Sequence, residues 1–449
     1  MMKGGEGLLR SANENLGTLP QASKEKHNLN RLLRDNREYF QQGRSENVAG
    51  SCGGPNFSRP FPKSSINGPS VAVSVSAETL RLARDPMDFS FAPHDNLQQL
   101  EWFFSGLSEV MVRRGHKRVD NPDQASLVIN PFARDEPKLF RRRGQAVFVV
   151  GVTELAPGQK SMDEAIPEGY PLLVRSLANL LIGVTGPGDS DPDVHFITPE
   201  QGHYQVNGTT DRREFFGKVY ERIEPLATSR LIIDNVFDED LPEELWEGDE
   251  ITASIRRAGV KLDALDVLPL PFPLDKILSK RDRRHLKKIF GMGGLSYGNI
   301  SARYDAEQFW MSASGVDKSN LREVGRDFLL VKSYDAEKGA MILSVPPNVE
   351  TRRVSVDAIE HWLIYREHPE VGAILHAHAW MKGVPSTEFN YPCGTYELGQ
   401  AVAEIVRQHS NPAQAVVGLR NHGLTITGES LDEIFDRIEG QLLRVVPMS

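Results

Sequence analysis

The stretch Val371-Gly-Ala-Ile-Leu-His376-Ala-His378 holds the first evidence for a fold and for a site. Its apolar run predicts a short buried strand over residues 371–375, and His376 and His378 follow that run. Because alternate residues of a strand face the same side, both imidazoles are expected to point to one place. Two such histidines supply half of the ligands of a divalent metal ion, so a third ligand must come from elsewhere in the chain.

His422 is the candidate for that third ligand. It lies in Arg420-Asn-His-Gly423, directly after a predicted strand over residues 415–419. Three histidines that leave one coordination position open allow a zinc ion to act as a Lewis acid on substrate oxygens. The alternative is that these are ordinary histidines at strand ends, which is the more frequent origin of an isolated His-x-His.

A candidate acid or base lies upstream. Asp357 and His361 are four residues apart on a predicted helix over residues 356–367, so they share a face. A carboxylate near a metal ion can serve as a ligand at rest and as an acid or base once substrate arrives. The alternative for Asp357 is helix capping, because it lies where the helix begins.

Two polar, glycine-containing stretches are candidates for binding an anion. They are Gly298-Asn-Ile-Ser-Ala-Arg303 and Ser312-Ala-Ser-Gly-Val316. Glycine lets backbone N–H groups approach an anion closely, and Ser and Asn add donors, so such loops suit a phosphate or carboxylate. The alternative is a pair of hairpin turns, which favour the same residues.

The 449 residues are long enough for two domains. Residues 1–68 are rich in polar residues and are expected to form a flexible tail. In residues 69–270, helical patterns alternate with short apolar strands, which predicts an α/β domain of unknown role. A proline-rich stretch over residues 268–273 is expected to separate it from a last domain at 274–449.

Charge and composition exclude several classes of protein. Lys and Arg number 52 against 61 for Asp and Glu, a net charge of -9, which argues against nucleic acid or an anionic membrane as the main partner. No apolar run approaches the roughly 18 residues that cross a bilayer, and the first residues lack an apolar signal core. We therefore expect a cytoplasmic protein. Cys52 and Cys393 are too far apart in sequence to indicate a disulfide framework or a cysteine zinc module.

The order of these motifs resembles the class II aldolase/adducin family over residues 280–445. The resemblance implies a C-terminal αβα sandwich of class II aldolase type with a mostly antiparallel central sheet. The expected fold class is therefore α/β, with this sandwich preceded by a separate α/β domain and a disordered N-terminal tail. The motifs that carry the resemblance are Gly298-Asn-x-Ser-x-Arg303, Ser312-x-Ser-Gly-Val316, His361-x-x-x-Tyr365, His376-x-His378 and Asn421-His-Gly423.

The resemblance also implies a function. It indicates a metal-dependent lyase that performs aldol cleavage or decarboxylation of a small hydroxy-carbonyl compound, including sugar phosphates, through a metal-stabilised enediolate. The protein is expected to be a homo-oligomer, either a tetramer or a dimer. Asp357 takes the place of the catalytic acidic residue of the family. The implied ligands of a divalent metal, zinc in most members, are His376, His378 and His422. The implied substrate-binding residues are Gly298, Asn299, Ser314, Gly315 and Ser355.

Two departures from the family pattern leave a second hypothesis open. The chain has Ser355-Val356 where the family has two serines, and the stretch after His422 lacks the tyrosine acid of the aldolases. Tyr391 and Tyr396 are alternative sources of that acid. The second hypothesis is a non-catalytic, adducin-like interaction or scaffold protein. The presence of all three histidines favours the enzyme.

Overall fold

The computed structural model describes most of the chain after residue 85. The predicted tail at 1–68 and the proline-rich stretch at 268–273 lie outside the described residues. Among the helices of the described part, none combines the length and apolarity needed to cross a membrane. The described ranges are 86–94, 97–142, 147–156, 161–186, 192–199, 202–267, 274–290 and 297–447.

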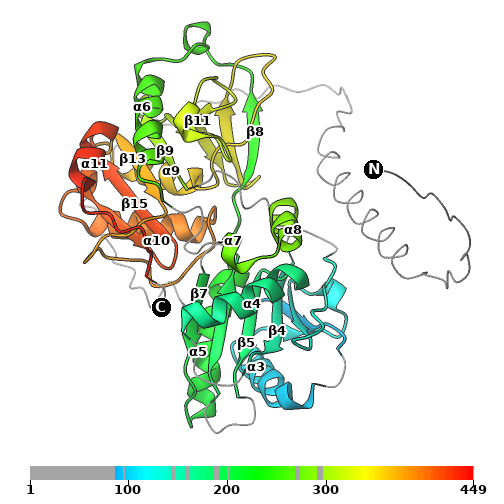
Figure 1. Cartoon of the computed structure of the whole chain (residues 1–449). Helices are drawn as coiled ribbons and strands as arrows, with labels where there is room; N and C mark the ends of the chain where they lie inside the picture. The colour runs from blue at the N-terminus through cyan, green and yellow to red at the C-terminus, as the bar shows by residue number, and fades with distance from the viewer. Residues whose placement is uncertain are drawn as a thin grey trace, which may run out of the picture. The chain divides into compact units, whose positions relative to one another are not determined.

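The first sheet has seven strands in the order β2-β1-β3-β4-β5-β6-β7. Figure 1 labels β4, β5 and β7 of this sheet. The strands from β2 to β5 pair in parallel, and β5, β6 and β7 pair antiparallel. The α/β class expected for this part is therefore present. Its elements are β1 (Asp88–Phe91), α3 (Glu101–Arg113), β2 (Lys117–Arg118), β3 (Leu127–Pro131), β4 (Phe148–Glu154), α4 (Met162–Ser176), β5 (Leu180–Val184), β6 (Val194–Thr198), β7 (Gly202–Val206) and α5 (Arg212–Thr228).

Strand β5 shows how this sheet is buried on both faces. Leu180 and Ile182 belong to the core formed with α3 and α5, whereas Leu181 belongs to the core formed with α4. A strand covered on both sides is apolar throughout, so its sequence has no alternating pattern. For this reason the sequence predicts a helix around residues 171–182, and this prediction is wrong at both ends, because the helix begins at Met162 and residues 180–184 form a strand. Helix α4 ends at Ser176, and Leu177, with φ of 58°, turns the chain into β5.

The second sheet has eight strands in the order β14-β15-β13-β9-β10-β11-β12-β8. Only β12 and β8 pair in parallel among these strands, and the other neighbours are antiparallel. Helices α6 and α11 pack together, as do α9 and α10. The elements are β8 (Asp234–Asp238), α6 (Glu250–Ala264), β9 (Gly298–Arg303), β10 (Phe309–Ser312), the short 3-10 helix η5 (Lys318–Asn320), β11 (Phe328–Asp335), β12 (Ala340–Ser344), α9 (Ala358–Glu367), β13 (Ala373–Ala377), α10 (Tyr396–Gln408), β14 (Val416–Leu419), β15 (Gly423–Gly428) and α11 (Leu431–Ile438).

The chain does not divide between the two sheets at the predicted boundary of residues 270–274. Strand β8 pairs with β12 of the second sheet, and Ile255 and Leu262 of α6 lie in the core of that sheet. Prolines mark the boundary visibly in the sequence, but the pairing partner of a short strand is not visible in its local pattern. The second sheet therefore includes β8, which precedes the predicted boundary, and the division of the chain into domains stays a prediction.

Two short helices after the proline-rich stretch belong with the first sheet. These are α7 (Leu274–Ile277) and α8 (Lys280–Phe290). Leu278 and Leu286 lie in the core beside α4, and Arg175 of α4 makes an ion pair of 2.8 Å with Asp282. The chain thus returns to the first sheet before it enters β9.

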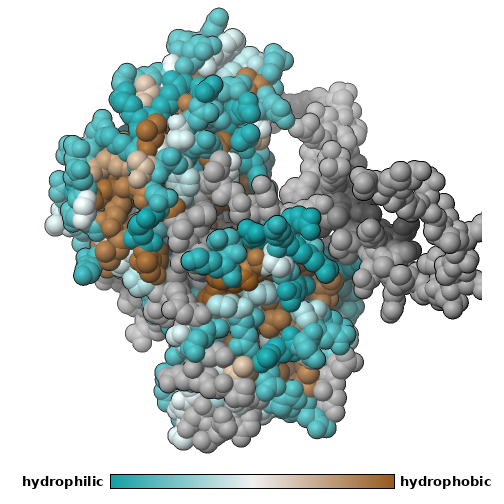
Figure 2. Space-filling model, viewed as in Figure 1, coloured by the Kyte–Doolittle hydropathy of each residue, from teal (hydrophilic) through white to brown (hydrophobic). Residues whose placement is uncertain are grey.

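The visible surface is mostly hydrophilic, with a hydrophobic area on the side where α11 lies (Figure 2). The segment that follows α11 exposes two apolar side chains, Leu443 at 38% and Val445 at 66%. Apolar side chains that gather at a surface often mark a contact with another molecule.

Candidate metal centre

Strand register brings the predicted motifs together in the middle of the second sheet. His376 lies in β13, opposite Asn299 of β9 on one side and Thr425 of β15 on the other. His378 follows directly after the end of β13. The two histidines therefore project from one end of a central strand, as the sequence predicts.

His422 reaches the same place from the turn between β14 and β15. Its backbone N–H donates to the Leu419 carbonyl at 2.9 Å, and Asn421 adopts a left-handed conformation with φ of 60°. Asn tolerates this conformation better than most residues, which makes a tight turn possible here. Because β15 pairs with β13, the turn holds His422 beside the end of β13.

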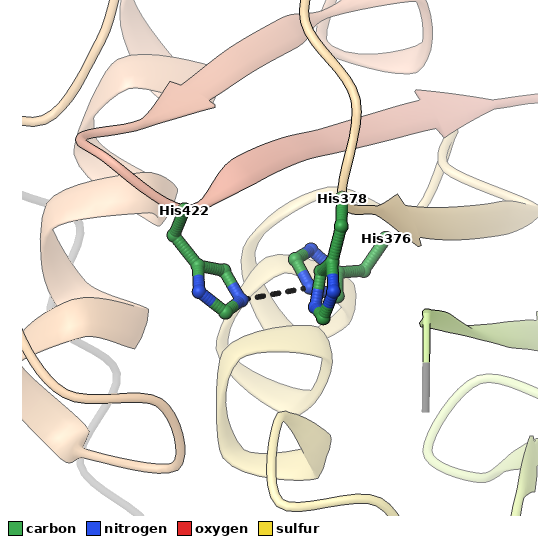
Figure 3. A group of neighbouring side chains, drawn as sticks. All are labelled: His376, His378 and His422. Carbon is green, nitrogen blue, oxygen red and sulfur yellow. Dashed lines mark hydrogen bonds between the residues drawn. The ribbon is translucent and has the colours of Figure 1, made fainter. Parts of the chain in front are cut away.

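The three imidazoles converge on one point (Figure 3). His376 Nε2 and His422 Nε2 are 3.2 Å apart, and one ring nitrogen from each of the three histidines lies within 4.8 Å of the others. In a tetrahedral zinc site, metal–nitrogen distances of about 2.0–2.1 Å place the nitrogens about 3.3 Å apart. The separations therefore suit a single divalent ion.

The surroundings favour neutral, metal-binding imidazoles. Burial lowers the pKa of His376 to about 4, and burial together with His378 and His376 lowers the pKa of His422 well below its ordinary value. His376 Nδ1–H donates to the Leu424 carbonyl at 3.0 Å, a tautomer that leaves the Nε2 lone pair for a metal. Metal ions bind neutral histidine, so the donor set fits a divalent cation.

Asp357 lies directly before the first residue of α9, but its carboxylate does not cap the helix. Instead Oδ2 accepts a hydrogen bond of 2.6 Å from Asn299 Nδ2, and Oδ1 has no hydrogen-bond partner among the described residues. The side chain is 5% exposed. Burial raises the pKa of Asp357, against the lowering effects of the Asn299 hydrogen bond, of His378, of the nearby Gly394 backbone N–H and of Lys318. The capping interpretation is therefore wrong, and the carboxyl group is available to exchange a proton.

The predicted anion-binding residues form two groups. Gly298 and Asn299 lie in β9 opposite Ala377 and His376, next to the histidines. A side chain at position 298, where φ is 144°, would meet the His376 carbonyl oxygen at 2.2 Å, so only glycine fits this close approach.

The second group joins the end of β10 to the start of α9. Ser314 N–H donates to the Arg353 carbonyl at 2.9 Å, and Ser355 N–H donates to the Ser312 carbonyl at 3.3 Å. Gly315 has open space where a side chain would be. The structure thus brings Ser314 and Gly315 next to Ser355, although they are about 40 residues apart in the sequence.

His361 does not pair with the Asp357 carboxylate as their shared face suggests. Its Nδ1 lies 2.7 Å from Ser301 Oγ, and burial lowers its pKa to about 3. Glu360, also buried, accepts a hydrogen bond from Thr425 of β15. Burial, with the nearby charge of Asp357, raises the pKa of Glu360 to about 8. This glutamic acid is therefore mainly neutral near pH 7.

Sequence reasoning missed two residues of the site, Lys318 and Cys393. Lys318 is 1% exposed, and its charge acts on both Asp357 and His376. Cys393 Sγ lies 3.2 Å from His422 Nε2. A signal existed only for Lys318, which follows Ser314-Gly315 after two residues; its burial could not be predicted, because lysine is almost always exposed.

Comparison with known proteins agrees with the resemblance of the motifs. Residues 284–387 match the Class II Aldolase and Adducin N-terminal domain. Methylthioribulose-1-phosphate dehydratase of Serratia proteamaculans is 38% identical over 82 residues, which cover 18% of this chain and 34% of that protein. The chain thus spans about a third of the length of this relative. The enzyme of the same name from Citrobacter koseri is 29% identical over 172 residues, 32% of this chain and 78% of that protein.

Among solved structures, L-fuculose-1-phosphate aldolase of Thermus thermophilus aligns with 41% of this chain and 86% of its own, at 20% identity and a TM-score of 0.27. The matched family region contains Asp357, His376 and His378, and His422 lies beyond it. Residues 284–387 are therefore a class II aldolase/adducin domain.

Proposed function

We propose that the protein is a metal-dependent lyase that acts on a small hydroxy-carbonyl compound, with a sugar phosphate as the favoured substrate class. The observation that carries the proposal is the convergence of three buried imidazoles next to a buried carboxyl group with one unpartnered oxygen among the described residues. Strongly shifted pKa values gathered in one place are typical of catalytic sites.

His376, His378 and His422 would hold the metal ion. A divalent ion at this position supplies a Lewis acid that polarises a substrate oxygen. The His376–Leu424 hydrogen bond orients one ring in advance, and the turn at residues 419–423 orients another. Ligands fixed in this way lose little freedom when the ion binds.

Asp357 would move the proton. The Asn299 amide holds Oδ2, so Oδ1 is the oxygen that exchanges a proton with the substrate. The raised pKa of Asp357 brings it closer to neutral pH, where a general acid or base works best. Burial has the further effect of excluding water that would compete for that proton.

The anionic part of the substrate would bind where Ser314, Gly315 and Ser355 meet. Open space at Gly315 and the nearby hydroxyl groups suit a phosphate or carboxylate. The curated relatives from Serratia proteamaculans and Citrobacter koseri are named for methylthioribulose 1-phosphate. That name supports phosphorylated sugars as the first class of substrate to test.

The alternative, a non-catalytic scaffold, does not account for this cluster. Burying a carboxyl oxygen without a hydrogen-bond partner and an ammonium without a close ion pair among the described residues costs several kcal/mol of stability in all, with no gain in packing. A protein that uses only its surface has no need of such groups. The cluster therefore favours an enzyme.

Elemental analysis of the purified full chain, followed by a substrate screen, tests the proposal. We expect about one divalent ion per chain and release of a carbonyl product from a sugar phosphate or a hydroxy acid. Protein free of metal after expression in zinc- or manganese-supplemented medium, and unable to bind either ion, would contradict the proposal. If the protein binds metal but turns over no compound in the screen, a non-catalytic scaffold would explain the results better.

We also propose that the chain assembles with copies of itself. The exposed Leu443 and Val445 support this, because apolar side chains of this kind are covered in an assembly. Light scattering coupled to size-exclusion chromatography is expected to give a dimer or a tetramer. A strict monomer across the accessible concentrations would contradict it.

A further inference from the structure

Lys318, in the short helix η5, is a buried cation that forms no close ion pair with the described residues. It is 1% exposed, and no carboxylate of the described residues forms an ion pair with it. Its ammonium lies 5.8 Å from the ring centroid of Tyr297. Lysine is almost never this buried without a partner, because an ammonium loses most of its hydration inside a protein. An ammonium held in this way can bind an anion that enters the site.

The fold holds the backbone of Lys318 in place. A side chain at Gly259 of α6 would meet the Lys318 carbonyl oxygen at 2.1 Å, so α6 packs directly against η5. On the other side, Asp317 caps η5 by accepting a hydrogen bond of 3.0 Å from Ser319 N–H. The inward position of Lys318 is therefore part of the packing and not a surface side chain folded back.

Lys318 acts on the same groups that form the metal centre. Its charge lowers the pKa of His376 and also the pKa of Asp357, so both lie within its electrostatic reach. Burial lowers the pKa of Lys318 itself to about 8, against the raising effects of Asp317 and Asp357. It therefore carries its positive charge near pH 7.

The charges of the complete centre do not balance without a ligand. A divalent ion contributes about +2, Lys318 +1 and an ionised Asp357 -1, whereas Glu360, with a pKa of about 8, is mainly neutral. The sum is about +2 in a buried place, which is costly unless an anion neutralises it. This excess positive charge would be neutralised by a ligand with two negative charges, or by a singly charged ligand that gains a second negative charge during the reaction.

We propose that Lys318 is a substrate-binding residue whose ammonium donates to an anionic phosphate or carboxylate oxygen of the substrate, beside Asp357. This inference rests on the proposed lyase function, since it assigns one contact of the same site. It adds a cationic contact to the serine and glycine residues named above, and it makes the negative charge of the substrate a condition of tight binding.

Isothermal titration calorimetry on the metal-loaded full chain tests this contact, with inorganic phosphate and glycolate as probes. Lys318→Met keeps the length of the side chain and removes its charge. We expect this variant to bind phosphate, glycolate or both at least tenfold more weakly than the wild type, at unchanged metal content. Lys318→Arg should restore part of the affinity. Lys338→Met, at an exposed lysine, is the matched control and should bind as the wild type does. A larger loss for phosphate assigns a phosphate contact, and a larger loss for glycolate assigns a carboxylate contact.

Unchanged affinity of Lys318→Met for both anions would overturn the inference, as would a wild-type protein that binds neither. With a substrate in hand, the variant should raise KM more than it lowers kcat. The two proposals can be contradicted separately. If Lys318→Met loses anion binding but the protein turns over no compound, the anion contact is supported and the lyase function is contradicted. If that variant turns over a substrate with an unchanged KM, the lyase function is supported and the anion contact is contradicted.

Discussion

Each of the two sheets contains a group of buried histidines, and the two groups differ in what surrounds them. In the first sheet, His195 of β6 and His203 of β7 stack, with Nδ1 of one 2.8 Å from Nε2 of the other. Burial lowers the pKa of His203 to about 4. The two rings thus partner one another, and two rings alone do not complete a metal site.

In the second sheet, three rings converge, and the groups around them are left incomplete. Asp357 and Asn299 each have one oxygen without a hydrogen-bond partner in the described part of the chain, and Lys318 forms no close ion pair there. Burial and a lowered pKa are common to both groups of histidines. The incomplete oxygens and the buried ammonium are what distinguish the candidate site, because native proteins satisfy nearly all buried polar atoms.

The sharpest way to break this comparison is to measure metal content after matched substitutions in the two sheets. His376→Gln should weaken zinc binding at least about 100-fold, beyond the 10- to 100-fold loss typical of residues that only support a ligand. His203→Gln should leave metal content unchanged, because its ring pairs with His195. Inductively coupled plasma mass spectrometry after dialysis against a weak chelator measures both. Equal metal in the two variants would mean that the second sheet holds no ion through His376.

Asp357→Asn tests whether the incomplete carboxyl group performs chemistry. The variant keeps the size of the side chain but cannot take a proton, so kcat should fall by about 10²–10⁴-fold. Metal content and the circular dichroism spectrum should match the wild type, because Asp357 neither belongs to the three-histidine group nor caps α9. Turnover within about threefold of the wild type, far less than the loss of a general acid or base, would remove Asp357 from the mechanism.

Local patterns predicted the elements around the site well. The sequence pattern predicts a helix over residues 396–408 and a strand over residues 309–312, and α10 and β10 have these bounds. The amphipathic spacing of α10 and the capping by Thr395 are readable from neighbouring residues alone. His376, His378 and His422 were also predicted together, since each follows an apolar strand run.

What the sequence does not show is where distant segments meet. The place of β8 in the second sheet depends on its pairing with β12, about 100 residues away. The proposed role of Lys318 depends on burial by α6, and the position of Cys393 depends on a loop that reaches His422. These contacts form only in the folded chain, and local sequence patterns do not show them.

When metal is absent, one histidine of each group, His203 and His376, is expected to lose stability over the same pH range, and His422 adds to the loss in the second sheet. His203 and His376 each have a folded pKa of about 4, below the ordinary 6.5 of the unfolded chain. Between these values the unfolded state binds more protons, so the stability that each neutral ring contributes is complete above pH 6.5 and is lost as the pH falls towards 4. Each contribution is at most about 3 kcal/mol.

Urea unfolding of metal-free protein between about pH 7 and 5, followed by circular dichroism, measures this effect. His203→Gln should flatten the dependence of the free energy of unfolding on pH, because its side chain does not titrate. An undiminished slope in that variant would show that His203 is not buried in its neutral form. Zinc should raise the free energy of unfolding near pH 7 in the wild type and in His203→Gln alike, because only the histidines of the second sheet are expected to bind it.

Substitution of Cys393 is expected to give the smallest effect on zinc binding. His203 contacts the ring of His195, whereas His422 Nε2 lies 3.2 Å from both the His376 ring and the Cys393 thiol. Thr395 holds the preceding loop by donating to the Pro392 carbonyl at 2.7 Å, so the thiol does not approach the ring by chance. Cys393→Ser should therefore weaken zinc binding by about tenfold or less, as loss of a supporting contact does. Competition with a fluorescent zinc chelator measures this change, and Cys52→Ser is the control for the other cysteine of the sequence. A loss as large as that of His376→Gln would instead make the sulfur a metal ligand, and the centre in the second sheet would then have four protein donors and no open position until substrate displaces one.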